Sequence, residues 1–386
     1  MHFNLNSEQR LLQDSVRRFI DKDYGFEQRT GQLRRGRDGS TEHWHVFADN
    51  GWLAAALPEE HGGLGGSVLD TVLITQQFGR GLVIEPYLGC AVLAAQTLTA
   101  VATAAQKDRL LPGLAAGSRC LALAYSESAS RGDPAVVTLT AKPNADGYLL
   151  QGSKTLVLGA LGADGIIVSA RIADTTGKAD ERITLFLVDA GAPGLSIRPL
   201  PLHDGSWAGE LMFDHVQVGA EELLGEAGAG LPALQLGLAH GVAALSAELV
   251  GGMEKAIEIT ADYLKLRKQF GVAIGSFQAL QHRMADMVAE MELARSMLYG
   301  LLDSIENDDL VARQHTVSQA KALIGRGARF VCGQAIQLHG GIGMTEEFAV
   351  GHFFKHAIVA DLLFGNSDQH EAACAAGVQR SLRPVG

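Results

Sequence analysis

Hydrophobic positions follow a helical period near the start of the chain. Five of them recur at intervals that place them on one helix face. They are Leu11, Leu12, Val16, Phe19 and Ile20. A second stretch, Cys90 to Ala105, is rich in alanine and leucine with threonine interleaved, and it predicts another helix. A glycine-dense turn, PEEHGGLGGS at 58–67, lies between the two.

The hydrophobic period changes to two between residues 121 and 220. Several segments there alternate between apolar and polar residues or run apolar, and Gly, Asp and Pro separate them. The segments are 136–142, 147–153, 166–172, 183–189 and 210–218. Strands at this spacing, with no helical pattern between them, predict an antiparallel β-barrel or sandwich.

After Pro232 the helical period returns and continues nearly to the end of the chain. The pattern predicts four helices, at 233–269, 277–304, 311–338 and 349–363. Long antiparallel helices of this kind form a bundle. The sequence therefore predicts an α+β fold with an N-terminal helical domain, a middle antiparallel β-barrel or sandwich, and a C-terminal four-helix bundle. The predicted domain boundaries are 1–120, 121–232 and 233–386.

Composition narrows the class of protein. Of the 386 residues, 19% are charged and 47% hydrophobic, which excludes wholesale disorder. The net charge of -11 argues against a nucleic-acid partner, because no basic surplus is available to neutralise phosphates. No stretch reaches about 18 uninterrupted apolar residues, and no secretory signal is visible at the start, so no membrane partner is expected.

Four cysteines show no paired spacing, which suits a reduced, cytoplasmic protein with buried thiols. They are Cys90, Cys120, Cys332 and Cys374. His43 and His45 flank Trp44, but no third ligand stands at metal spacing, so no metal site is expected. The glycine-rich segment 225–230 closes the strand region and lacks the βαβ context of a dinucleotide fingerprint, so it is interpreted as a turn.

Three other motifs form a connected set at helix ends. They are RKQFG at 267–271, QLHGGIGM at 337–344 and FGNSDQ at 364–369. Gly340 and Gly341 would allow close approach of a flat or phosphorylated group. Arg267 would fork onto a pyrophosphate, and Phe270 would cover an aromatic edge. Taken singly, each motif is equally well explained as a helix end followed by a glycine stop.

Longer motifs carry a resemblance to a known family. PEEHGGLGG, AYSESASRGDP (124–134), GSKTLVLGA (152–160), FQALQHRMADM (277–287) and QLHGGIGM occur in this order along the chain. Together with RKQFG they resemble the acyl-CoA dehydrogenase family across essentially the whole length. The resemblance implies a homo- or heterotetramer that binds acyl-CoA and holds FAD between subunits, with the flavin ring on the barrel of one subunit. The bundle of a neighbouring subunit reaches the pyrophosphate and adenosine, and an electron-transferring flavoprotein is the expected acceptor by analogy.

The same resemblance assigns residues to the cofactor. The expected FAD-binding residues are Arg267, Gln269, Phe270, Gln278, Gln337, Gly340, Gly341, Asn366, Asp368 and Ser126. In the family a carboxylate removes the α-proton of an acyl thioester while the β-hydride passes to the flavin.

The catalytic base that the family requires is missing. Its usual glutamate aligns with Phe364, and the alternative position used by a subgroup aligns with Gly241. Neither residue accepts a proton. Asp361 and Glu248 would substitute only if the backbone shifted, because base placement is limited by geometry. No catalytic residue is therefore assigned in this chain.

The barrel motifs have changed as well. The family's tryptophan and threonine beside the flavin ring align with Leu156 and Leu158, whereas Ser126 and Glu127 remain. The bundle motifs are intact. The chain thus resembles the small, base-lacking subunits of heteromeric acyl-CoA dehydrogenases, such as the small subunit of the pimeloyl-CoA enzyme.

Three hypotheses follow. In the first, the chain is a base-lacking subunit that completes the FAD site of a sibling acyl-CoA dehydrogenase subunit. In the second, it is an active homomeric acyl-CoA dehydrogenase with a relocated base. In the third, it is a non-enzymatic scaffold that binds acyl-CoA or protein on the same fold. Flavin content with and without a sibling subunit separates them.

Overall fold

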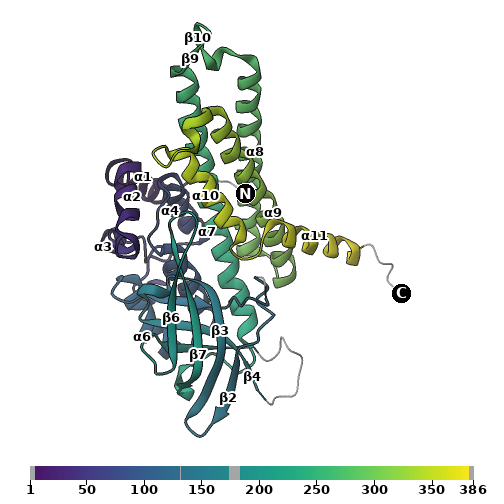
Figure 1. The fold of residues 1–386 in the computed structure, drawn as a ribbon. Coiled ribbons are helices and arrows are strands. Elements are labelled where there is room, and N and C mark those ends of the chain that lie inside the picture. The colour runs from purple at the N-terminus through teal and green to yellow at the C-terminus, as the bar shows by residue number, and fades with distance from the viewer. Residues whose placement is uncertain (1–4, 131, 174–182, 382–386) are drawn as a thin grey trace. The chain divides into compact units, whose positions relative to one another are not determined.

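The computed structural model describes residues 5–130, 132–173 and 183–381 of the chain (Figure 1). It confirms the α+β fold, with helices first, a sheet in the middle and a helix bundle last. The described residues form two compact units, and each is treated by itself. The bundle unit comprises Met1–Gly31, Val72–Val83 and Val242–Gly386; the sheet unit comprises Gln32–Thr71 and Ile84–Gly241. The three domain boundaries expected from the sequence stay a prediction.

Short helices make up the N-terminal region. They are α1 (Ser7–Asp23), α2 (Phe26–Arg34), η1 (Gly36–Thr41), α3 (Trp44–Asp49), η2 (Glu59–His61), α4 (Val68–Gly81), η3 (Leu88–Ala94), α5 (Ala95–Val101) and α6 (Ala104–Ala115). Val16, Phe19 and Ile20 are buried on α1, as the helical period predicts, whereas Leu11 is 66% exposed.

The stretch from Cys90 to Ala105 is not one helix. It begins within a π-helix, η3, continues as α5 and stops at Ala102, which is extended. Thr103 then caps α6, because its side chain accepts from the backbone N–H of Gln106 while the Gln106 side chain accepts from the backbone N–H of Thr103. The capping box explains why an alanine-rich run breaks there.

The middle region is a mixed sheet. Its strands are β1 (Leu121–Ala124), β2 (Thr140–Asn144), β3 (Gly147–Leu158), β4 (Gly165–Ile172), β5 (Ile183–Asp189), β6 (Leu195–Pro201), β7 (Trp207–Val218) and β8 (Leu223–Leu224). The order is β6-β7-β3-β2-β4-β5-β8, with β1 beside β4. Most pairs are antiparallel as predicted, but β4 pairs in parallel with both β1 and β2.

One face of the sheet forms a continuous apolar core. Its fully buried members include Ala122, Leu139, Leu150, Ile166, Val168, Phe186, Leu211, Phe213 and Val216. Strand β6 was not predicted, because Pro199 and Pro201 interrupt its pattern. Proline is tolerated there because β6 is an edge strand that pairs only with β7.

Five described helices form the C-terminal region: the first four lie close to the predicted ranges, and the fifth was not predicted. They are α7 (Gly230–Leu266), α8 (Gln278–Asn307), α9 (Leu310–His339), α10 (Ala349–Leu362) and α11 (Ser367–Ser381). In the bundle unit, Arg295 of α8 pairs with Glu254 of α7 at 2.7 Å. Lys321 of α9 donates to the carbonyls of Ala360 and Asp361 on α10, each at 2.9 Å.

By length and composition alone, α7 is the one helix of the described residues apolar enough to cross a membrane. Of its most apolar window, 72% is buried, which is the pattern of a core helix. The cysteines differ in part from expectation. Cys90 and Cys332 are buried, but Cys120 and Cys374 are only half-buried.

Candidate functional site

The ends of α7 and α9 lie together at one end of the bundle. The Tyr263 hydroxyl of α7 donates to the backbone carbonyl of His339 on α9 at 3.3 Å, and their rings stack with centroids 4.4 Å apart. After α7 the chain forms the hairpin β9 (Lys268–Gln269) and β10 (Val272–Ala273), which Figure 1 shows at the far end of α7 and α8. After α9 it forms the 3-10 helix η8 (Gly340–Met344). The motifs RKQFG and QLHGGIGM therefore occupy the same end of the bundle unit.

The predicted nucleotide-binding residues at these motifs are all exposed. They are Arg267, Gln269, Phe270, Gln278, Gln337, Gly340 and Gly341. We call these seven residues the nucleotide cluster. Exposure of the whole set is what a surface for a ligand or a neighbouring subunit requires.

Phe270 is the most unusual member. Its side chain is 91% exposed and its φ is 54°, in the left-handed region that bulky residues rarely adopt. With Gly271 at φ 84° it makes the two-residue hairpin turn, which requires positive φ at both positions. Its ring meets Phe277 edge-on at 6.2 Å. An exposed aromatic residue in a costly conformation indicates a contact outside this chain.

Gly340 and Gly341 leave open space in front of the backbone. A Cβ added at either position would meet no atom of another residue within 4 Å. Gly340 also has φ 65° and ψ -140°, a conformation that is essentially confined to glycine. An open backbone cradle at the same end of the bundle as an exposed arginine fits the pyrophosphate part of a dinucleotide, so the bundle residues fit this part of FAD.

Two other predicted cofactor residues have structural partners. The Asn366 side chain caps α11 by accepting from the N–H of Gln369 at 2.9 Å. Asp368 pairs with Arg326 of α9 at 3.5 Å. Arg326 precedes Gly340 by 14 helical residues, which corresponds to about 20 Å along the helix. The structure therefore does not bring Asp368 to the nucleotide cluster.

The position of the missing glutamate is occupied by a buried ring. Phe364 is 9% exposed and has φ 63°, and Gly365 follows at φ 91°. Its carbonyl accepts a hydrogen bond from Nε2 of His370 at 2.9 Å. Burial lowers the pKa of His370, although the hydrogen bond to the Phe364 carbonyl opposes this, so the imidazole is neutral at pH 7. The backbone keeps an unusual turn there, but no proton acceptor stands at its apex.

Asp361 is engaged in the fold and does not replace the base. It is buried, and its Oδ1 accepts from the backbone N–H of Ser367 at 3.1 Å and from the Ser367 hydroxyl. Its Oδ2 contacts Arg329 at 3.5 Å. These bonds satisfy the carboxylate and cap α11.

Glu248 likewise has a partner. Its carboxylate lies 3.6 Å from Nε2 of His356 on α10. Gly241, the other position considered for a base, lies in the sheet unit. Within the described residues, neither proposed substitute is an unengaged carboxylate.

The sheet unit contains a buried ion pair that the sequence did not reveal. Nζ of Lys154 lies 2.8 Å from Glu127, and both side chains are almost fully buried. Lys154 also donates to the Tyr125 carbonyl and to Ser169. Lys154 is the one charged residue of the segment 152–160, which is a signal, but the sequence gives no distance between it and Glu127.

Electrostatics explains how this pair survives burial. Burial opposes the charge on Glu127, but Lys154 and hydrogen bonds from Thr138 and Leu139 outweigh it and lower the pKa of the carboxyl. Burial lowers the pKa of Lys154 to about 8, against the opposing effect of Glu127. Ser126, beside this pair, is buried, and its carbonyl accepts from the N–H of Thr155 at 2.9 Å. These residues brace β1 and β3 against each other.

The segment of β3 that follows Lys154 contains Leu156 and Leu158, the two positions at which the resemblance expects a tryptophan and a threonine. β3 has an irregular register between Lys154 and Val157, and Leu156 within it has φ 54°. Leu156 and Leu158 are half-buried. Their side chains offer no hydrogen bond to the polar edge of a flavin ring, so they fit the ring less well than the bundle residues fit the nucleotide.

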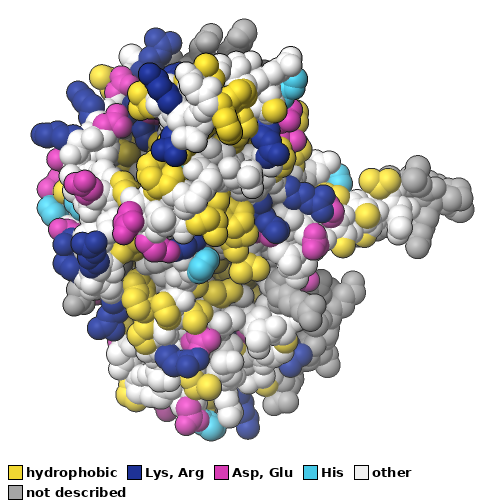
Figure 2. Space-filling view, turned by 45° about the horizontal axis from the view of Figure 1, so that its top comes forward, with side chains coloured by type: hydrophobic (Ala, Val, Ile, Leu, Met, Phe, Trp, Pro, Cys, Tyr) yellow, Lys and Arg dark blue, Asp and Glu magenta, His cyan; other side chains and the backbone are white. Residues whose placement is uncertain are grey.

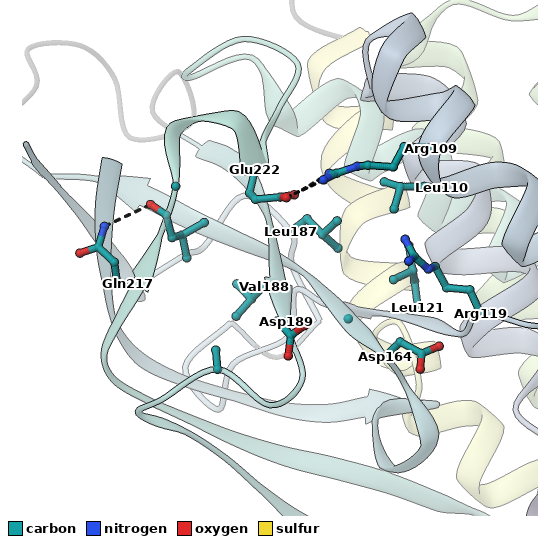
Figure 3. Close-up of a pocket in the computed structure, with 14 residues that line it drawn as sticks. Arg109, Leu110, Arg119, Leu121, Asp164, Leu187, Val188, Asp189, Gln217 and Glu222 are labelled. Carbon is teal, nitrogen blue, oxygen red and sulfur yellow. Dashed lines mark hydrogen bonds and ion pairs between the residues drawn. The ribbon is translucent and has the colours of Figure 1, made fainter. Parts of the chain in front are cut away.

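A hollow in the sheet unit lies apart from these positions. It measures about 340 Å³, and its lining combines the Arg109–Glu222 ion pair with Arg119, Asp164 and Asp189 (Figure 3). None of the expected cofactor residues lines it. Among the described residues, no group of three or more metal-ligating side chains comes together.

Comparison with known proteins decides the family. The acyl-CoA dehydrogenase N-terminal, middle and C-terminal domain models match residues 6–118, 122–216 and 228–379. The chain belongs to the acyl-CoA dehydrogenase family. "Acryloyl-CoA reductase (NADH)" of Anaerotignum propionicum is 27% identical, over 98% of this chain and 96% of that protein.

Solved structures of acyl-CoA dehydrogenase-like proteins support the same family assignment. A variant of the "Tcur3481-Tcur3483 steroid ACAD" is 31% identical with a TM-score of 0.86, covering 97% of this chain and 98% of that one. "PigA with FAD and proline" is 26% identical with a TM-score of 0.87, covering 98% and 99%. The cofactor is FAD, consistent with the family and with such complexes.

Proposed function

We propose that this chain is the base-lacking subunit of a heteromeric acyl-CoA dehydrogenase, where it completes the FAD site of a sibling subunit. The sibling supplies the barrel surface for the flavin ring and the carboxylate for proton abstraction. This chain supplies the end of its bundle. The reaction served is α,β-desaturation of an acyl-CoA thioester, and the cytoplasmic location expected from the sequence stays a prediction.

One observation carries the proposal. Every member of the nucleotide cluster is exposed, whereas Phe364, at the position of the family base, is a buried ring. A subunit acting alone would need both a nucleotide site and a base. This chain retains the residues that would bind the nucleotide of a neighbouring subunit's FAD, and it lacks the residue that would act as its own catalytic base.

The roles of the cluster follow from its chemistry. Arg267 would pair with the pyrophosphate through its planar fork of donors. Gly340 and Gly341 would let the phosphates approach the backbone, since no side chain intervenes. Phe270 would cover the edge of an aromatic ring. When bound, FAD supplies the hydride acceptor, and no residue of this chain moves a proton in the reaction.

Exposed apolar side chains on the bundle unit support a subunit interface. Apart from Phe270 they include Leu266, Val272, Phe277, Val288, Leu293, Phe330, Ile342 and Met344. Figure 2 shows hydrophobic side chains at the surface among lysine and arginine side chains on the face it presents. Apolar patches rimmed by charge are typical of protein interfaces. One similar structure is named "Tcur3481-Tcur3483 steroid ACAD". This name contains two components, which is consistent with a partnership of unlike chains.

The test is co-expression with a sibling acyl-CoA dehydrogenase chain of the same organism that carries the glutamate. We expect the purified complex to contain as much FAD as it has sibling chains, and a straight-chain or branched acyl-CoA to bleach its visible flavin absorbance. The chain purified alone should bleach no flavin. Replacing the sibling's glutamate with glutamine should abolish bleaching in the complex.

Two results would contradict the proposal. Bleaching by the chain alone would support a homomeric enzyme with a relocated base. Absence of FAD from every mixture with a sibling would support a scaffold without flavin.

A further inference from the structure

Two aromatic side chains join the last turn of α7 to the last turn of α9. The hydroxyl of Tyr263 donates to the backbone carbonyl of His339 at 3.3 Å, and the two rings stack with an interplanar angle of 28°. A helix leaves its last four carbonyls without partners inside the helix, and the carbonyl of His339, the last residue of α9, is one of these. Tyr263 therefore supplies a hydrogen bond that α9 cannot supply itself.

This carbonyl belongs to the peptide group that leads into Gly340. A hydrogen bond to it limits rotation of that planar group, on which ψ of His339 (-20°) and φ of Gly340 (65°) both depend. Gly340 and Gly341 are the two residues with open space in front of their backbone. The 3-10 helix η8 also packs on His339, because a Cβ added at Gly343 would lie 3.0 Å from its Cβ. Tyr263 and His339 thus fix the conformation of the glycine pair from the side of the bundle.

The imidazole of His339 is buried with one nitrogen unpaired. The residue is 3% exposed, and its ring also contacts Phe348 with centroids 4.9 Å apart. Nδ1 lies 2.8 Å from the Ala335 carbonyl, which places the proton of the neutral ring on Nδ1 and leaves Nε2 as an acceptor. Within the part of the chain that the structure describes, Nε2 has no hydrogen-bond partner. Protonation would add a buried charge and an N–H donor without an acceptor, so this pocket favours the neutral ring.

The groups around the ring offer no compensating charge. Tyr263 of α7 contributes a phenol, and Ala335 of α9 contributes a carbonyl. Gly343 of η8 and Phe348, which precedes α10, carry no charge. No carboxylate of the described residues pairs with His339. Burial lowers the pKa of His339 from its ordinary value of 6.5, and the hydrogen bond to Ala335 opposes this only in part.

We infer that Tyr263 and His339 form a pH-sensitive clamp, which fixes the backbone of Gly340 and Gly341 for the nucleotide while His339 is neutral and releases it when His339 is protonated. The imidazolium leaves the aromatic pocket for water, and its stacking on Tyr263 is lost. The glycine pair then regains its large conformational freedom, and the cradle binds the nucleotide more weakly. The identity of the ligand, the FAD of a sibling subunit, rests on the function proposed above, whereas the clamp does not. Both residues are positioning residues.

The sign of the pH dependence follows from the burial of the ring. A released imidazole binds a proton near its ordinary pKa of 6.5, whereas the buried ring of His339 does so only at lower pH. The clamped state therefore binds fewer protons than the released state. Its stability is fully present above about pH 6.5 and is lost as the pH falls below that value.

The first test uses the full chain alone and needs no flavin. Hydrogen exchange read by mass spectrometry gives the protection of the amides in 337–348, relative to the unfolded peptide, at about pH 7.5 and about pH 5.5. We expect protection in the wild type to fall by up to about tenfold at the lower pH, because one pH unit below 6.5 changes the linked equilibrium tenfold. His339→Phe keeps a buried ring but cannot titrate, so its protection should change by less than about twofold. His315→Phe, the control 24 residues earlier on α9, should behave as the wild type does.

The second test measures FAD retention by the complex with a sibling subunit. Tyr263→Phe removes the hydroxyl and keeps the ring, so retention at neutral pH should fall about fivefold, the effect of one neutral hydrogen bond. Tyr299→Phe is the matched control, since Tyr299 lies 21 residues beyond Gln278 on α8, about 30 Å along that helix. It should retain FAD as the wild type does. At about pH 5.5 the His339→Phe complex should lose less FAD than the wild-type complex does.

Three results separate this clamp from the partner role. An equal loss of amide protection on acidification in the wild type and in His339→Phe would overturn the clamp. So would full FAD retention by a Tyr263→Phe complex. A wild-type complex without FAD at either pH would contradict the partner role instead, and the exchange measured on the chain alone would still decide whether the clamp exists.

Discussion

The resemblance assigns the two halves of a flavin site to the end of the bundle and to the β1–β3 region of the sheet unit, and these two regions use their residues differently. At the bundle end, the nucleotide cluster faces solvent, and open space lies in front of Gly340 and Gly341. In the sheet unit, Lys154 and Glu127 are buried and bonded to each other, and Leu156 and Leu158 stand where the resemblance expects a tryptophan and a threonine. The exposed residues of the first region are available to a ligand or to a neighbouring subunit. The second holds the chain together.

The variant with the largest expected effect tests whether the Lys154–Glu127 pair stabilises the sheet unit. Lys154→Met should destabilise the chain by about 3–5 kcal/mol, because it leaves the Glu127 carboxylate buried without its cation. Urea unfolding of the purified chain measures this. Lys265→Met removes an exposed ion pair with Asp262 and should cost less than about 1 kcal/mol. Equal losses of unfolding free energy in the two variants would show that the buried Lys154–Glu127 pair stabilises the chain no more than an exposed ion pair does.

A second change tests whether the bundle end is open for a ligand. Gly341→Leu adds a side chain where no atom of the chain stands within 4 Å, so folding should be unaffected. In the complex with a sibling subunit it should weaken FAD retention by about 100-fold, because the cradle is filled. Gly162→Leu is the matched control, since Gly162 also has nothing within 4 Å and lies in the sheet unit. Full flavin content in the Gly341 variant would place the nucleotide elsewhere.

Arg267→Ala tests the pyrophosphate contact and should have a smaller effect. Loss of one charge-assisted partner on an exposed surface should weaken FAD retention by the complex by about tenfold. Dialysis followed by flavin absorbance gives the ratio. The neighbouring Lys268→Ala, also exposed, should leave flavin content near that of the wild type. A complex that retains all its FAD without Arg267 would show that this residue has another role.

The smallest expected effect concerns the missing base. Phe364→Glu restores the family residue at its aligned position, yet we expect no acyl-CoA-dependent bleaching by the variant alone, because Leu156 and Leu158 still occupy the aligned positions beside the ring. Unfolding experiments would report whether a buried charge has destabilised the variant. Bleaching by a folded Phe364→Glu chain without a sibling would show that its barrel half still holds flavin.

The sequence predicted the long helices well because their apolar period is strong. Predicted ranges such as 311–338 differ from α9 (Leu310–His339) by one residue at each end. β6 was missed because prolines break its pattern, and the hairpin after α7 was missed because its strands have two residues each. The break between α5 and α6 depends on one capping box at Thr103, which an alanine-rich pattern conceals.

For the site, the sequence grouped three motifs. The structure brings RKQFG and QLHGGIGM to the same end of the bundle, whereas Asp368 of FGNSDQ pairs with Arg326 away from it. The sequence did not predict the bonds that occupy Asp361, since these depend on where α11 begins. The Lys154–Glu127 pair joins residues far apart in the chain, and no local pattern reports such a contact.

The most direct measurement is the flavin absorbance of the chain purified alone and of its complex with a sibling subunit, before and after addition of an acyl-CoA. We predict little or no bleaching for the chain alone, and bleaching in the complex that disappears when the sibling's glutamate is replaced. Rapid flavin reduction by the chain alone would contradict this account.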